Sequence, residues 1–358
     1  SFLPLVGPLL PWKRVVPPPA LPGERFLAAV KVGLRYVRHS RPLQIILWRA
    51  VAFVFFTGII FSLLPSLAIH HLNTTSEGFG FLLGCIGAGA VLATTFLPRL
   101  RARMATNRLL LVFHLLALAG IAGLGFSTRS WMAGLALFAC GMSWLSVLST
   151  VNTAIQLSVP SWVKARAFGC YTTAWGGALA IGATFWGTVA MRFGIRVAFL
   201  AAGAGLLLAT LLVHRLKIEA LDHEPDMTPH RAAHHPASGL DLEAGPILIQ
   251  LEYRIPMAKC DEFRAAMREV RRIRKRDGAI RWSLFEEPAA KDQDMVAFQE
   301  SFVSTSWGEH LRQHHRATME DREIFAAAYR LDPEGRPRIR HLVAAWEEHE
   351  ALLDRIWE

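Results

Sequence analysis

The chain has 358 residues, of which 52% are hydrophobic and only 19% are charged. This composition, with a positive mean hydropathy, excludes an ordinary soluble protein of this length and indicates a membrane protein. The net charge of +10 is uneven, because residues 1–215 hold 18 Lys and Arg against two acidic residues. Those basic residues lie in short clusters between apolar runs, which predicts cytoplasmic loops and argues against a nucleic-acid interface.

The segment before the first long apolar run, residues 1–42, has two parts. Residues 1–10 are apolar but too short to cross a bilayer, and they begin without Met, so we expect the tail of an earlier span and a chain that is a fragment. Residues 24–40 alternate apolar and basic positions with helical periodicity. We predict an amphipathic helix on the inner membrane surface there.

Six apolar runs are long enough to cross a bilayer, which requires about 20 residues in helical form. The fifth is rich in Gly and Thr and is the weakest. Together they predict an all-α, six-helix transmembrane domain over residues 43–217. The runs are residues 43–69, 79–97, 109–126, 131–157, 168–190 and 197–213.

Small residues recur along two of these runs. Gly80 and Gly84 lie four residues apart in the second run, and Gly176 and Gly177 are adjacent in the fifth. Small residues let helix backbones approach closely inside a membrane. We therefore predict that these four glycines serve helix packing rather than direct ligand binding.

Lys and Arg concentrate in alternate connections. Three arginines precede the first run, four lie between the second and third, and Lys164 and Arg166 lie between the fourth and fifth. Basic connections face the cytoplasm. We predict a multi-pass protein of the plasma or bacterial inner membrane with both ends cytoplasmic.

The last third of the chain has a different pattern. Residues 218–245 contain three prolines and lack periodicity, which predicts a flexible linker, and residues 347–358 form a C-terminal tail. Between them, residues 246–346 predict a β-α-β-β-α-β order, the ferredoxin-like arrangement. An open sheet face in such a domain would suit pairing with a second copy. The strands are expected at 247–255, 279–285, 294–304 and 337–345, and the helices at 259–276 and 307–329.

Metal and cofactor signals are weak. His310 and His314 are one helical turn apart and could share a metal, but no HExxH pattern accompanies them and residues 309–316 are otherwise charged. We expect a solvated helix face there. The four cysteines form no CxxC pair. We predict no metal site, no cofactor and no nucleophile–base arrangement.

Several stretches resemble a known family. They are the basic loop PRLRAR at 98–103, VPSWVKAR at 159–166, RIRKRDGAIRW at 272–282 and ESFVSTSWGEHLRQHHRAT at 300–318. In these the chain resembles the C-terminal half of a major facilitator superfamily transporter of the enterobactin-exporter branch, in the transmembrane secretion effector subgroup. The basic loop lacks the acidic residue and the glycines usual in the superfamily.

The resemblance implies a transporter with twelve spans in two halves and a substrate site between them. This chain would supply the second half, and its partners would be the missing N-terminal half, the lipid bilayer and a small molecule. The C-terminal domain would be similar to dimeric α/β-barrel proteins. That family includes cofactor-free monooxygenases, so a membrane-tethered enzyme and a dimerisation or regulatory module are the alternatives to a simple transporter.

Polar and aromatic groups inside a membrane are candidates for a substrate site, because they are costly unless they face a cavity. We predict Trp144, Asn152 and Gln156 of the fourth run, with Thr172 and Trp175 of the fifth, as substrate-binding residues. Interhelical hydrogen bonding would explain Asn152 and Gln156 as well. The apolar runs contain no acidic residue, so either a carboxylate that couples export to protons lies in the other half or coupling works differently. The expected function is proton-coupled efflux of a small amphipathic compound such as a siderophore or drug.

Overall fold

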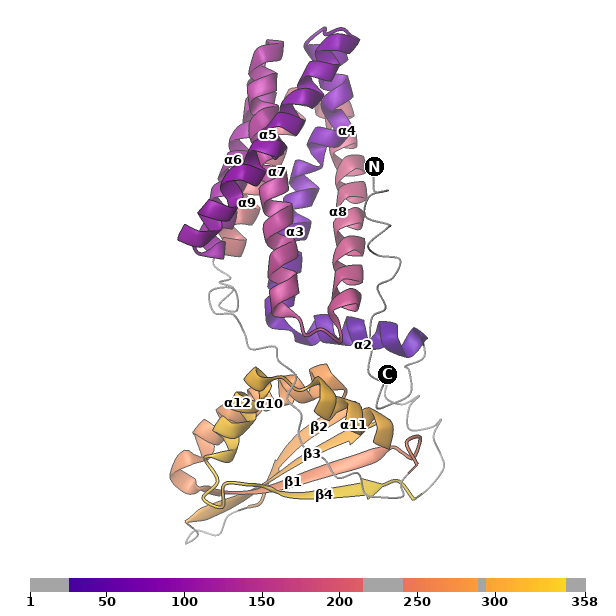
Figure 1. The fold of residues 1–358 in the computed structure, drawn as a ribbon, viewed down its shortest axis with the longest axis vertical. Helices are drawn as coiled ribbons and strands as arrows, with labels where there is room; N and C mark the ends of the chain where they lie inside the picture. The colour runs from indigo at the N-terminus through magenta and orange to yellow at the C-terminus, as the bar shows by residue number, and fades with distance from the viewer. Residues whose placement is uncertain (1–25, 215–240, 289–293, 346–358) are drawn as a thin grey trace, which may run out of the picture.

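The computed structural model describes residues 26–214, 241–288 and 294–345. Long helices form an upright bundle, helix α2 (Phe26–His39) lies across one end of it, and a C-terminal domain lies beyond α2 (Figure 1). The predicted span remnant at 1–10, most of the predicted linker and the tail at 347–358 lie outside the described residues.

Five helical segments in the described part are long and apolar enough to cross a membrane. The first joins α3 (Arg41–Thr57), α4 (Ile59–Ser66) and a π-helical turn η1 (Leu67–His71) into one rod. Helix α8 (Lys164–Phe193) is long enough at 30 residues, but its Gly- and Thr-rich sequence is less apolar, so the sixth span remains a prediction. The remaining segments are α5 (Ser76–Arg103), α6 (Thr106–Phe126), α7 (Ser130–Ser158) and α9 (Ile195–His214).

Glycines set the closest approaches within the bundle. A Cβ atom on Gly89 of α5 would lie 2.0 Å from the carbonyl oxygen of Phe138 in α7, and one on Gly141 of α7 would lie 2.1 Å from that of Ile86 in α5. On α8, a Cβ on Gly182 would lie 2.7 Å from the carbonyl oxygen of Phe55. Only a residue without a side chain allows backbones to meet this closely.

The C-terminal domain is a four-stranded antiparallel sheet in the order β2-β3-β1-β4. Alternate residues of β1 from Ile247 to Ile255 are buried under the helices. Those helices cover the sheet face that points toward α2, and the other sheet face points away from the bundle (Figure 1). The elements are β1 (Ile247–Pro256), η3 (Met257–Lys259), α10 (Cys260–Asp277), β2 (Arg281–Glu286), β3 (Met295–Ser304), α11 (Trp307–Arg316), α12 (Met319–Tyr329) and β4 (Arg338–Val343).

The prediction of a single helix at 307–329 is wrong, because the chain forms two helices there, α11 and α12. Ala317 has an extended backbone, and Thr318 starts the new helix with a capping box. The hydroxyl of Thr318 accepts a hydrogen bond from the Asp321 N–H at 3.2 Å, and the Asp321 carboxylate accepts one from the Thr318 N–H at 2.9 Å. A Thr-x-x-Asp pattern is a helix-start signal, and apolar periodicity does not detect it.

A buried carboxylate organises the interior of this domain. Glu300 of β3 is fully buried, and its oxygens accept hydrogen bonds from Arg274 at 3.0 Å, Trp282 at 2.9 Å and Tyr253 at 2.8 Å. The three donors come from α10, β2 and β1. Glu300 therefore ties the main helix to three neighbouring strands.

We predict that Glu300→Gln destabilises the C-terminal domain by about 3 kcal/mol, because removing one partner leaves the Arg274 charge buried without compensation. Hydrogen exchange of β1 and β3 in the full chain in detergent should report this loss of protection. Glu269→Gln is the matched control, since Glu269 pairs with Arg272 at an exposed site and should change stability by less than about 1 kcal/mol. Equal protection in both variants would contradict the assigned role.

Candidate functional site

Aromatic side chains from α4, α7 and α8 lie against one another, and Phe61 among them is 47% exposed. Trp144 lies edge-on to Phe61 with ring centroids 4.7 Å apart, and to Trp175 at 5.4 Å. The ring centroid of Tyr171 lies 5.6 Å from that of Trp175. The structure thus brings together the two tryptophans singled out from the sequence, although they lie on different helices. We call Phe61, Trp144, Tyr171 and Trp175 the aromatic cluster.

A small hollow lies beside Trp144. Helices α3 to α7 all contribute to it, and Thr57 supplies the one hydroxyl group of its lining. The hollow has a volume of about 10 Å³, which is the size of a single water molecule, so it is at most one corner of a larger site. The residues that line it are Thr57, Ile60, Phe61, Ile86, Ala117, Cys140, Gly141 and Trp144.

Helices α7 and α8 carry buried polar atoms without hydrogen-bond partners among the described residues. The side-chain oxygens of Ser146 and Asn152 on α7 and the hydroxyl of Tyr171 on α8 are buried, and none has a hydrogen-bond partner among the described residues. A buried polar group that makes no hydrogen bond costs about 1–3 kcal/mol. These groups are therefore suited to a ligand that brings its own donors and acceptors.

Two of the predicted substrate-binding residues lie at the surface. Gln156 is exposed near the end of α7. Thr172 is also exposed, and its hydroxyl donates back to the carbonyl oxygens of Phe168 and Gly169 on its own helix, at 3.0 and 3.1 Å. Neither belongs to the aromatic cluster in the described structure.

The four glycines expected to pack helices face open space. A Cβ atom on Gly80, Gly84, Gly176 or Gly177 would meet no described atom within 4 Å. Their packing role therefore remains a prediction, and it needs a neighbour other than the described helices. The close contacts occur at Gly89, Gly141 and Gly182 instead, which no simple spacing pattern distinguishes from the others.

Sequence reasoning missed a second polar site. Arg49 of α3 is buried and donates hydrogen bonds to the Asn107 side chain at 2.7 Å and to the Val213 carbonyl at 3.2 Å. His114 and Thr210 line the small hollow next to it. A positive charge inside a membrane segment is a functional feature by default. The sequence showed the lone arginine but gave no sign of partners on α6 and α9.

The expectation of a solvated face at residues 309–316 is wrong. His310 is buried, and its Nε2 lies 3.2 Å from that of His314 and 3.1 Å from that of His341 in β4. Trp307 packs on the same imidazole ring. The three histidines form an imidazole cluster between α11 and the sheet. Within the described ranges, no group of three or more His, Cys, Asp or Glu is arranged to hold a metal ion.

The family is decided by comparison with known proteins. The sequence pattern of the family described as "Transmembrane secretion effector" matches residues 1–349, nearly the whole chain. The chain belongs to this family of major facilitator transporters. The resemblance drawn from residues 272–282 and 300–318 is thereby confirmed. No curated protein shows significant similarity to the chain.

Membership identifies a membrane transporter and implies a small-molecule substrate and a lipid bilayer. The apolar helices agree with a multi-pass membrane protein. The aromatic cluster, with the unpaired hydroxyl of Tyr171, is therefore the candidate substrate site among the described residues.

The glycines of α8 offer a matched test of packing. We predict that Gly182→Ala lowers the melting temperature of the detergent-solubilised chain, because the added Cβ overlaps the Phe55 carbonyl and costs about 1–3 kcal/mol. Gly177→Ala should not lower the melting temperature, since open space surrounds Gly177 and Ala favours a helix more than Gly does. Equal melting temperatures for the two variants would contradict the described packing.

Proposed function

We propose that the protein is a secondary active exporter that moves a small amphipathic compound, such as a siderophore or drug, by alternating access. The aromatic cluster carries this proposal, because its rings and the unpaired oxygens of Asn152 and Tyr171 combine apolar and polar recognition inside a membrane bundle. Trp144 and Trp175 would hold the apolar part of the substrate. Asn152 would bind a polar group about two helical turns further along α7.

The open faces of α5 and α8 support a second six-helix half as partner. Gly80 and Gly84 on α5, with Gly176 and Gly177 on α8, meet nothing in the described structure, and Gln156 and Thr172 are exposed. In this proposal the second half covers these faces, and the substrate lies between the halves near the bilayer midplane. Gln156 and Thr172 would then line the cavity.

We propose proton coupling through a carboxylate in that second half. Among the described membrane helices the acidic residue present is Glu77, which is exposed in the first turn of α5. The bundle end next to α2 carries Arg101, Arg103 and Lys164. By the positive-inside tendency we infer that this end faces the cytoplasm, and we propose that the protein lies in the cell's inner membrane with both ends cytoplasmic.

Efflux from cells that express the complete gene tests this function. We predict that Trp175→Ala and Asn152→Ala each lower export from a panel of amphipathic dyes and siderophores about tenfold or more, since each removes a group that binds cargo. A protonophore should abolish export by the unaltered protein. Trp131→Ala is the control, because Trp131 is exposed at the far end of α7. Export that persists in both site variants would remove these residues from the site.

The open sheet face supports a further part of the proposal, pairing of two C-terminal domains. Phe285 and Leu342 lie on the face away from the helices and are 58% and 47% exposed. Apolar groups on an uncovered sheet face favour association with a second copy. Light scattering of the full chain in detergent should show a dimer, and Phe285→Glu should reduce it to a monomer. A monomeric unaltered chain would refute this pairing.

A further inference from the structure

Two aromatic rings lie together at the end of the bundle next to α2. Tyr36 of α2 is almost fully buried, and Trp162 lies in the connection between α7 and α8. Their rings meet edge to face with centroids 5.7 Å apart. Helix α2 also packs directly on the start of α8, where a Cβ atom on Gly33 would lie 2.7 Å from the Cβ of Arg166.

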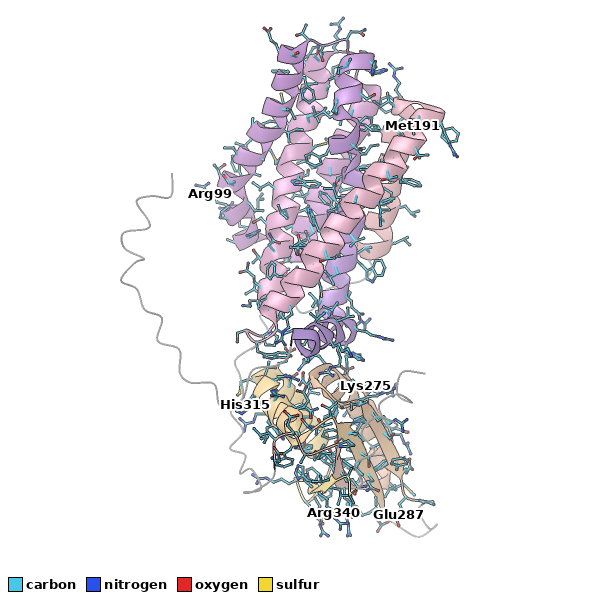
Figure 2. The ribbon with its side chains drawn as sticks, turned by 90° about the vertical axis from the view of Figure 1, so that its right-hand side faces the viewer. Arg99, Met191, Lys275, Glu287, His315 and Arg340 are labelled. Atoms are coloured by element: carbon cyan, nitrogen blue, oxygen red, sulfur yellow. The ribbon has the colours of Figure 1, made fainter. Side chains whose placement is uncertain are left out.

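Two arginines of the C-terminal domain cover these rings. The guanidinium of Arg276, at the end of α10, lies 5.4 Å from the centroid of Tyr36. The guanidinium of Arg316, at the end of α11, lies 5.0 Å from the centroid of Trp162. Figure 2 shows the neighbouring residues Lys275 and His315 on the side of the domain turned toward α2. A cation over an aromatic face is attracted by the ring electrons, more strongly when water is excluded.

Both guanidinium groups are held in place by their own domain. Arg276 donates to Asp277 at 2.8 Å and to Asp321 at 2.7 Å. Arg316 donates to the Glu309 carboxylate at 2.6 Å and to the Asp277 carbonyl at 2.7 Å. These carboxylates fix the direction of the two cations before any contact with α2. The domain therefore presents a rigid pair of charges that matches the pair of rings.

The positive charge of Arg276 is favoured by its carboxylate partners. Burial works against the charge of Arg276, but the carboxylates of Asp277 and Asp321 outweigh it and hold the pKa of Arg276 well above its usual value. From the membrane side, Arg35 of α2 adds a hydrogen bond of 3.4 Å to Glu309. Gly278 leaves room for this contact, since a Cβ atom there would lie 3.3 Å from the Arg35 guanidinium.

The contacted segments belong to the helices of the candidate site. Trp162 connects α7, which carries Trp144 and Asn152, to α8, which carries Trp175. If the α7–α8 connection moved away from α2, Trp162 would leave Arg316 or pull the domain with it. A tilt of α2 would likewise separate Tyr36 from Arg276.

We propose that the C-terminal domain is a latch that pins α2 to the α7–α8 connection through Arg276 on Tyr36 and Arg316 on Trp162. Movement of the α7–α8 connection away from α2 then requires the latch to release. The consequence for transport rests on the proposed function, whereas the docking itself does not, and the test below uses no substrate.

The test removes the rings and leaves the domain intact. A site for a specific protease is inserted into residues 218–245 of the full chain, which is placed in nanodiscs of neutral phosphatidylcholine. After cleavage the domain should stay bound to the nanodisc in the unaltered chain. It should be released in the Tyr36→Leu, Trp162→Leu double variant. Trp131→Leu is the matched control, because Trp131 begins α7 at its other end, and it should retain the domain.

Hydrogen exchange on the uncleaved nanodisc samples tests whether the domain holds the α7–α8 connection in place. Residues 158–167 should exchange about tenfold faster in the double variant than in the control, because the latch no longer holds this connection. Exchange in β1 and β3 should be equal, which shows that the domain remains folded. Retention of the cleaved domain by the double variant would refute the docking. Release without faster exchange at 158–167 would refute the pinning.

Discussion

The absence of hydrogen-bond partners in lipid is the constraint on which this structure depends. Every backbone group in the apolar bundle must be satisfied within its own helix, so the first two thirds of the described chain are almost entirely helical. Helices in lipid gain little from apolar burial against one another, and close approach must supply the attraction. That is why α5 and α7 cross where Gly89 faces α7 and Gly141 faces α5.

The same constraint makes a polar group without a hydrogen-bond partner a sign of a ligand site. Inside the bundle, hydroxyls mostly donate back to their own helix, as Thr150 does to the Ser146 carbonyl at 2.6 Å. Asn152 and Tyr171 depart from that rule, and Tyr171 does so within the aromatic cluster. A polar atom kept unpaired in such surroundings is costly, and a cargo that satisfies it recovers the cost. Arg49, by contrast, has partners within the bundle, because the Asn107 side chain and the Val213 carbonyl accept its hydrogen bonds.

The C-terminal domain is stabilised differently, because it combines strands with charged amphipathic helices. Its stability rests on an apolar core under one sheet face and on charges whose partners come from several elements. Glu300 joins three donors inside the domain, while Asp277 and Glu309 orient the arginines at its surface toward α2. One set of ion pairs stabilises the domain, and the other determines where it meets the membrane helices.

The sequence by itself determined the membrane class, most of the spans, the four strands and the first helix of the C-terminal domain, and the family. These follow from local patterns, namely apolar run length, strand alternation and short motifs, which do not depend on distant residues. It also identified Trp144 and Trp175 as candidates, because a tryptophan in a membrane run is visible without a structure.

Only the tertiary structure decided which residues meet. The contacts of Trp144 with Trp175, of His310 with His341 and of Tyr36 with Arg276 join positions 31 or more residues apart, and no local pattern encodes such distances. The glycines show the same limit: Gly177 and Gly182 are alike in sequence, yet only Gly182 touches another backbone. Which face of a helix is covered depends on the helices that pack against it, and that is fixed by the whole bundle at once.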